Sequence, residues 1–282
     1  MQLYALDSSL HIAAHNAKKS KNYYCPECNS LVRVRSGPLR QIHFYHLRVS
    51  KNCRQHQKSL EHLHAQLKLL SLIGAEEAQM ECLFPAIQRI ADVAWHAQKI
   101  VFEVQCSPIP LEEVQSRNRD YEKVGYTVIW ILHDRQFNKR SVPASESSLR
   151  GSLCYYTNID KAGKGIIYDQ FEVLEKNRRL FKGPPLDVAP TQISRFPTIT
   201  LADPMLPKML MSRLARWKFY AAGDLFYRLR KEGNLSSSAA KMIEIEAKFA
   251  HKQKREVKRP PLRTLLVKSY QSALDYVLRD LL

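Results

Sequence analysis

Two mostly apolar stretches, residues 89–95 and 100–106, constrain the fold more than any other feature of the sequence. Four residues separate them, so they are predicted to form an antiparallel strand pair joined by a short turn. In that register Asp92 lies directly opposite Glu103. Side chains paired in this way lie roughly 5 Å apart, where two like charges destabilise a sheet. The two carboxylates therefore need a compensating positive charge.

A divalent cation is one source of that charge, because carboxylate oxygens are the ligands that Mg2+ and Mn2+ prefer. Gln105 lies two residues beyond Glu103 and is predicted to project from the same face of the strand. Phe102 and Val104 then point to the opposite face, into a core. We therefore expect Asp92 and Glu103 to hold Mg2+ or Mn2+, with Gln105 beside them.

The order of predicted elements around this pair indicates an α/β fold. Leucines at helical spacing predict a helix over residues 58–73, and a short strand is expected at 78–83. After the strand pair, a second helix follows Pro110 and ends at Gly125. The continuous apolar run 126–132 then predicts a strand that is buried on both faces. A helix that returns the chain to a new buried strand is typical of a mixed sheet.

The charge of the chain predicts a polyanionic partner. The formal net charge is +17 and the isoelectric point is about 9.7, values typical of chains that bind DNA, RNA or an anionic membrane. No run of 18 apolar residues is present, which disfavours the membrane. The first residues lack the layout of a signal peptide, so we expect a cytoplasmic protein. In that reducing compartment the six cysteines favour metal ligands or buried thiols over disulfides.

Two cysteines with two residues between them, Cys25 and Cys28, indicate a zinc-binding module near the start of the chain. His43, His46 and Cys53 follow at a spacing typical of a small zinc ribbon. We expect Cys25, Cys28, His46 and Cys53 to bind Zn2+. His43 is an alternative to either His46 or Cys53. Four protein ligands leave no open position, so the predicted zinc is structural and orders a segment too polar to build its own core.

Two predicted helices carry further polar residues near this region. Glu61 lies beside His62 on the first helix, with Gln66 one turn beyond His62. A carboxylate on this helix is suited to contact a metal above the acidic strip. Arg117 and Tyr121 lie one turn apart on the second helix, and their shared face is a candidate contact for a phosphate. Without the acidic strip, both faces would be interpreted as ordinary solvated helix surface.

A hairpin is expected between residues 153–159 and 165–174, with 160–163 as its turn. The C-terminal part of the chain as a whole is predicted to be basic and mainly helical. Six prolines between residues 184 and 207 indicate an extended connector, and helical patterns follow at 205–231, 236–254 and 262–281. From Met205 onward the chain has 17 Lys and Arg against 7 Asp and Glu. We favour contact with nucleic acid over a merely solvated helix face. The candidate DNA-binding residues are Lys252, Lys254, Arg255, Lys258 and Arg259.

Spaced motifs between residues 20 and 135 resemble those of the CoiA competence protein family. They are Tyr24-Cys25-Pro26-Glu27-Cys28, Arg33-Val34-Arg35-Ser36-Gly37-Pro38, His43-Phe44-Tyr45-His46, Cys53, Ser59-Leu60-Glu61-His62-Leu63, Ile90-Ala91-Asp92-Val93, Glu103-Val104-Gln105-Cys106-Ser107, Arg117 with Tyr121, and Val128-Ile129-Trp130-Ile131-Leu132. The resemblance implies a nuclease-like domain of the PD-(D/E)XK superfamily, whose core has the same order of helix, three strands, helix and strand.

We therefore expect three parts in the chain. Residues 1–57 would form the N-terminal region with the zinc-ribbon-like module, and residues 58–150 a PD-(D/E)XK domain with a restriction-endonuclease-like mixed sheet. Residues 151–282 would form the basic, mainly helical region.

The resemblance also implies roles for individual residues. Glu61, Asp92 and Glu103 would be the metal-associated acids. Gln105 stands where most such nucleases carry a lysine, and Gln66 stands where a basic residue is expected in the family. A glutamine is neutral and cannot act as a general base, so the activation of water would fall to the metal.

On this basis we expect a metal-dependent DNA nuclease-like protein that acts on incoming DNA in natural transformation and recombination. Asp92 and Glu103 would hold the metal against a phosphodiester. Gln105 would orient a water molecule, and Glu61 would position that water or the metal. Arg117 and the basic helices would bind DNA, with a preference for single strands. The alternative is a non-catalytic DNA-binding adaptor that recruits recombination proteins. Recognition of RNA by the zinc module is disfavoured, because basic and aromatic residues are not concentrated there.

Overall fold

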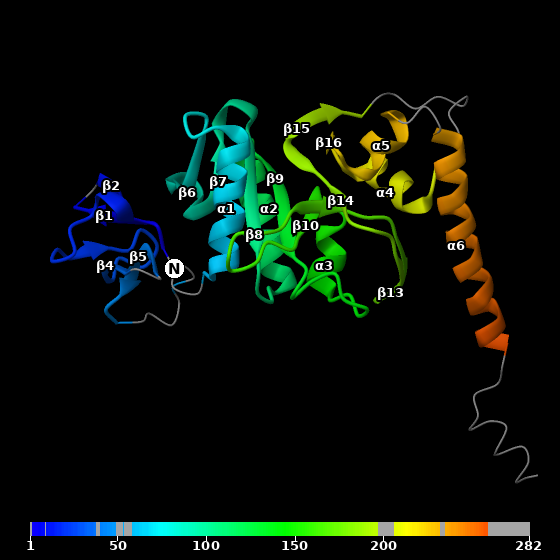
Figure 1. Ribbon diagram of the computed structural model, residues 1–282, viewed down its shortest axis with the longest axis horizontal. Helices are drawn as coiled ribbons and strands as arrows, with labels where there is room; N and C mark the ends of the chain where they lie inside the picture. Colours follow the sequence, from blue (N-terminus) through cyan, green and yellow to red (C-terminus); the bar gives the residue numbers. More distant parts are fainter. Residues whose placement is uncertain are drawn as a thin grey trace, which may run out of the picture.

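The chain is arranged as a small N-terminal module, a central sheet covered by helices, and a C-terminal group of helices. In the computed structural model the N-terminal strands lie at one end of the long axis and the last described helix lies at the other (Figure 1). The structure describes residues 2–8, 10–37, 40–48, 53, 58–196, 206–231 and 235–258. Among these residues, no helix combines the length and apolar character that crossing a bilayer requires.

The N-terminal module is a five-stranded antiparallel sheet with the strand order β2-β1-β3-β4-β5. Its strands are β1 (Tyr4–Asp7), β2 (Leu10–Ala13), β3 (Tyr23–Tyr24), β4 (Leu31–Gly37) and β5 (Arg40–His46). Val32 and Val34 are buried while Leu31, Arg33 and Arg35 are exposed, so β4 has the alternation of a half-buried strand. The core of this module is small, which fits a segment that needs further stabilisation.

The central sheet has seven strands in the order β14-β11-β10-β9-β8-β7-β6. Its bounds are β6 (Ala78–Phe84), β7 (Arg89–Trp95), β8 (Ile100–Gln105), β9 (Thr127–His133), β10 (Cys154–Thr157), β11 (Ile167–Asp169) and β14 (Leu186–Asp187). Three helices accompany it, α1 (Leu60–Ile73), α2 (Leu111–Lys123) and α3 (Ala144–Leu149). Strands β8, β9 and β10 are parallel and the outer pairs are antiparallel. The predicted α/β class with a mixed sheet is therefore confirmed.

Helices α1 and α2 cover opposite faces of the central strands. Phe102 and Ile131 pack in the same core as Leu63 of α1, whereas Val101 and Trp130 pack in the core that contains Tyr121 of α2. Strand β9 is consequently buried on both faces, as its continuous apolar run predicts. The order of helix, three strands, helix and strand is also as predicted.

The predicted register of the strand pair is confirmed. Trp95 pairs with Ile100 and Val93 with Phe102 in the antiparallel ladder of β7 and β8. The turn is a single 3-10 turn that ends at Lys99, whose φ is 54°. The ladder ends at Val93 and Phe102, so the predicted pair of Asp92 and Glu103 is not part of it. The two side chains are held by different helices, Asp92 by α1 and Glu103 by α2.

The prediction of a mainly helical region after residue 150 is wrong for residues 151–196. The antiparallel pairing expected between residues 153–159 and 165–174 is present as β10 with β11. Strands β10, β11 and β14 of this segment extend the central sheet, and further strands are β12 (Glu172–Glu175), β13 (Arg178–Lys182) and β15 (Ala189–Arg195). The prolines between residues 184 and 207 predict an extended connector, but the strands β14 and β15 lie within this stretch. Pro190 lies at a register shift of the two-stranded sheet that contains β15. A missing N–H is tolerated at such a bulge. The sheet thus continues past residue 150.

The helical pattern predicted over 205–231 is interrupted by a strand. The structure has α4 (Lys208–Arg216), β16 (Phe219–Ala222) and α5 (Leu225–Lys231), with β16 paired to β15. Gly223, with φ +85°, turns the chain directly against the backbone of Asp187, where a side chain would collide. The predicted helix at 236–254 is present within α6 (Leu235–Lys258), and the one predicted at 262–281 lies outside the described residues.

A buried ion pair attaches α4 to the central sheet. The two terminal nitrogens of Arg213 each donate to one oxygen of Asp169 in β11, at 2.6 Å, and the Arg213 guanidinium also stacks on Trp217 at 4.3 Å. Both partners are buried. A carboxylate left alone in this position would be strongly destabilising, so the pair makes the C-terminal segment part of the same folded unit.

We predict that Arg213→Met lowers the free energy of unfolding by about 3–5 kcal/mol, because Asp169 is left buried without its cation. Chemical denaturation followed by circular dichroism measures the change. Lys248→Met is the control, since Lys248 belongs to an exposed ion pair on α6 and should leave the unfolding curve unchanged. Equal effects of the two substitutions would contradict the anchoring role of Arg213.

Candidate functional site

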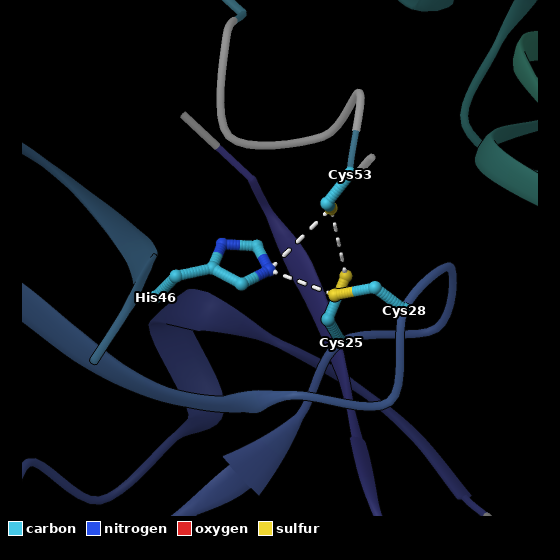
Figure 2. Close-up of side chains that lie close together, drawn as sticks. All are labelled: Cys25, Cys28, His46 and Cys53. Carbon is cyan, nitrogen blue, oxygen red and sulfur yellow. Dashed lines mark hydrogen bonds between the residues drawn. The ribbon is translucent and has the colours of Figure 1, made fainter. Parts of the chain in front are cut away.

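Four side chains of the N-terminal module converge on one point (Figure 2). Cys25 and Cys28 lie in the turn after β3, His46 ends β5, and Cys53 comes from the segment that follows. The Sγ atoms of Cys25 and Cys53 are 3.7 Å apart, and His46 Nε2 lies 3.3 Å from Cys28 Sγ and 3.5 Å from Cys53 Sγ. All four ligand atoms lie within 4.8 Å of one another.

These separations fit a tetrahedral zinc ion. With Zn–S near 2.3 Å and Zn–N near 2.0 Å, tetrahedral ligands are about 3.5–3.8 Å apart. The cluster of Cys25, Cys28, His46 and Cys53 is thus able to bind a metal such as zinc, with the ligand set expected from the sequence. Within the described part of the chain it is the one group of three or more Cys, His, Asp or Glu side chains arranged to share an ion.

His43, the alternative ligand, lies elsewhere. It is three residues before His46 on β5, so the alternation of the strand directs the two rings to opposite faces. His43 is buried and accepts a hydrogen bond from Nε of Arg35 at 2.9 Å. The geometry therefore favours His46 as the fourth ligand.

A cleft of about 870 Å3 lies where the N-terminal module meets the central sheet. Asp92 and Gln105 line it from the strands, and Pro26 and Glu27 of the zinc-binding turn line it from the other side. Its basic lining residues are Lys58, His62, Arg89, Arg117 and Arg135. Its acidic lining residues are Asp92, Glu27 and Glu113, so basic side chains outnumber them. An excess of positive charge suits a phosphate-bearing ligand.

Asp92 is the most heavily bonded acid in this cleft. Its Oδ1 lies 2.9 Å from Lys58 Nζ, 3.0 Å from His62 Nε2 and 3.0 Å from Gln66 Nε2. Its Oδ2 accepts the backbone N–H of Val104 at 2.8 Å. Burial alone would raise the pKa of Asp92, but the charges of His62 and Lys58 outweigh it and hold that pKa well below its usual range. Asp92 is therefore ionised at neutral pH.

Glu103 is held from the other side of the sheet. Its carboxylate accepts the hydroxyl of Tyr121 at 2.7 Å and forms an ion pair with Arg117, both from α2. Burial raises the pKa of Glu103, and the negative charge of Asp92 adds to this, while Arg117 and Tyr121 act in the opposite direction. The like charges predicted on the paired strands are thus compensated by cations of the protein itself.

The remaining predicted catalytic residues are not in one cluster. Glu61 forms an ion pair with Arg135 at 2.8 Å, and its second oxygen is buried without a hydrogen-bond partner among the described residues. Gln105 lines the cleft, where its amide donates to the carbonyl and hydroxyl of Ser107 at 2.7 and 3.2 Å. Glu61 therefore approaches the site from α1 without joining the hydrogen bonds of Asp92.

The predicted DNA-binding residues have different environments. Arg117 lines the cleft but is committed to Glu103 and to Glu113, the latter at 2.9 Å. Tyr121 is fully buried and its hydroxyl donates a hydrogen bond to Glu103, so this hydroxyl does not reach the surface. The basic cluster lies at the end of the chain that the structure describes least: the side chains of Lys252, Lys254, Arg255 and Lys258 on α6 are not described, and Arg259 lies outside the described residues.

Sequence reasoning missed the residues that neutralise Asp92. Lys58 lies directly before Ser59, whose Oγ accepts the backbone N–H of His62 and caps α1. A basic residue ahead of a helix cap is not by itself a signal of function. One signal did indicate a missing cation. The residues at positions 66 and 105 are neutral glutamines, so a buried Asp92 requires a positive charge from elsewhere in the chain.

Two protein-family models match the chain, one over the N-terminal module and one over most of the central sheet. A model described as "Competence protein CoiA, nuclease-like domain" matches residues 58–169, and one described as "Competence protein CoiA, N-terminal domain" matches residues 6–56. No curated protein and no solved structure matches the chain. Residues 58–169, which carry most of the central sheet, thus match a nuclease-like domain that follows a Cys3His module. The chain belongs to the competence protein CoiA family.

The cluster geometry predicts about one zinc per chain, measurable by mass spectrometry of the purified protein. His46→Gln should lose the zinc, because it removes a ligand. The matched variant His43→Gln should keep it, because His43 bonds to Arg35 instead. Retention of zinc by His46→Gln together with its loss from His43→Gln would contradict the assignment.

Proposed function

We propose that this protein binds incoming DNA during competence and cleaves its phosphodiester backbone with the help of Mg2+ or Mn2+. The observation that carries the proposal is the ionised Asp92 in a cleft lined by Lys58, His62 and three arginines. The match to a nuclease-like domain of a competence protein supports the same conclusion. The expected setting is the cytoplasm, where recombination proteins are candidate partners.

The fold that we propose for residues 58–150 is that of the restriction endonucleases. The order of α1, β6, β7, β8, α2 and β9 supports it, as does the mixed sheet with helices on both faces. In this arrangement Asp92 and Glu103 come from adjacent strands, and Glu61 comes from the helix that precedes them.

The two strand acids carry the carboxylate oxygens that a hard divalent cation prefers, and Asp92 lines the cleft. Asp92 and Glu103 would hold it, and it would have to compete with Lys58 and Arg117 for them. Bound there, such an ion would lower the pKa of a water molecule and offset charge on the phosphoryl oxygens. The zinc of the N-terminal module is proposed to be structural.

The side chains of the cleft suit the tasks that phosphodiester cleavage requires. Arg135, whose side chain is 57% exposed, can contact a DNA phosphate, and Arg89 and Arg117 add positive charge to the wall. Gln105 carries an amide that can hydrogen-bond a water molecule beside Asp92. Such contacts do not depend on the base sequence, and single-stranded DNA is the proposed substrate.

One observation favours the alternative of a non-catalytic DNA-binding adaptor that recruits recombination proteins. Both oxygens of Asp92 and both of Glu103 already have protein partners, so no carboxylate oxygen of the pair is left without one. A site neutralised by its own lysine and arginine is stable without a metal. The adaptor would keep the cationic cleft and bind DNA without cutting it.

One assay distinguishes the nuclease from the non-catalytic adaptor. Labelled single- and double-stranded DNA is incubated with the protein and Mn2+, Mg2+ or EDTA, and both cleavage and binding are measured. We expect metal-dependent cutting that Asp92→Ala reduces by about 10²-fold or more while DNA binding is retained. Glu76→Ala, which changes an exposed acid away from the cleft, is the control and should cut like the wild type.

Binding without cutting under every metal would favour the adaptor. Cutting that Asp92→Ala leaves intact would show that the activity does not come from this cleft.

A further inference from the structure

The cleft lacks a positive charge at both positions where the family resemblance would place one. Position 105 on β8 and position 66 on α1 are glutamines. Gln66 nevertheless donates to Asp92 Oδ1, so this position contacts the acid but supplies no positive charge. A cation that contacts the reacting phosphate would have to come from another part of the chain.

We propose that Lys58 is the catalytic cation of this cleft and that it contacts the phosphoryl group of the bound DNA. This inference rests on the proposed nuclease function. Lys58 lies outside the strands, in the segment that leads into α1, and its Nζ lies 2.9 Å from Asp92 Oδ1. Its side chain is 10% exposed and lines the same cleft as Gln105.

The position of Lys58 is fixed by a second carboxylate. Glu81 Oε1 lies 3.2 Å from Lys58 Nζ, and Glu81 Oε2 accepts the backbone N–H groups of Leu3 and Tyr4 at 3.2 and 3.1 Å. Glu81 is therefore anchored on the N-terminal module while it holds the lysine. If Asp92 takes part in holding a metal, Glu81 keeps the ammonium group at the cleft.

The backbone at Glu81 is strained in a way that serves this contact. Its φ is +48°, in the left-handed region that non-glycine residues seldom adopt, although it lies within β6. The ladder between β6 and β7 pairs Met80 with Val93 and Cys82 with Ala91, and Glu81 takes no part in it. Strain of this kind destabilises a fold and gathers at functional sites. Here it directs a buried carboxylate at Lys58.

His62 also contacts Asp92, whereas the arginines of the cleft are committed to different acids. Arg117 pairs with Glu103 and Glu113, and Arg89 pairs with Glu113 and Asp120. Arg135 pairs with Glu61 from an exposed position. Among the lysines and arginines that the structure describes, Lys58 is the one with an ion pair to Asp92.

The reaction in which Lys58 would act is hydrolysis. The oxygen of water forms a bond to phosphorus, and the bond from phosphorus to the leaving ester oxygen breaks. One proton of the water passes to solvent, and the leaving oxygen takes up a proton. Lys58 stays protonated throughout and donates a hydrogen bond to a non-bridging oxygen, where negative charge builds in the transition state.

A purely structural role for Lys58 makes different predictions. In that case the lysine only neutralises the buried pair Glu81 and Asp92, so Lys58→Met would act through stability alone. A new lysine at position 105 would then leave the cutting rate unchanged. In the catalytic role, Gln105→Lys supplies a cation to the same cleft and restores part of the lost rate.

The test measures single-turnover cleavage of DNA with Mn2+ at saturating protein, for the full chain and its variants. We expect Lys58→Met to cut about 10²–10³-fold more slowly with DNA binding retained, the loss typical of removing one donor to a transition state. Lys58→Arg should retain part of the rate, and the double variant Lys58→Met/Gln105→Lys should recover part of it. Lys68→Met, an exposed lysine on α1, is the matched control and should cut like the wild type.

Several outcomes overturn the proposal, and each is distinct. Wild-type rates for a folded Lys58→Met reject the role of Lys58 and leave the nuclease function standing. If Lys58→Met fails to fold, inactivity of a folded Lys58→Arg and of the folded double variant rejects it. Absence of cutting by the wild type rejects the nuclease function, and the role of Lys58 falls with it.

Discussion

The structure depends on the burial of two carboxylates on adjacent strands. Asp92 and Glu103 are 5% and 1% exposed, and a buried charge without a partner costs several kcal/mol. Each acid draws its partners from a different side of the sheet, Asp92 from the start of α1 and Glu103 from α2. The acidic pair thus fixes where both helices lie, and the fold and the candidate site are set by the same contacts.

The N-terminal module contacts both the central sheet and the cleft. Glu81 of the central sheet accepts hydrogen bonds from the backbone at Leu3 and Tyr4, and Glu27 of the zinc-binding turn lines the cleft. Glu27 also lies 3.5 Å from the Sγ of Cys53, a member of the metal cluster. The metal cluster and one wall of the cleft are thus linked through Glu27.

The sequence predicts local features well and distant ones poorly. The register of Trp95 with Ile100 and the cysteine pair at Cys25 follow from alternation and spacing over a few residues, and the structure has both. The strands after residue 150 depend on distant partners: β10 lies beside β9, and Asp169 is held by Arg213 from α4. The contact of Lys58 with Asp92 is equally distant in the sequence, because it depends on Asp92 and the start of α1 meeting in the fold.

A structure of the Asp92→Asn variant with a short single-stranded DNA and Ca2+ would test the central claim most directly. The account predicts that a phosphate of the DNA lies in the cleft, between position 92 and Lys58, with Arg135 at its rim. DNA bound on another face of the protein, with the cleft empty of phosphate, would contradict it.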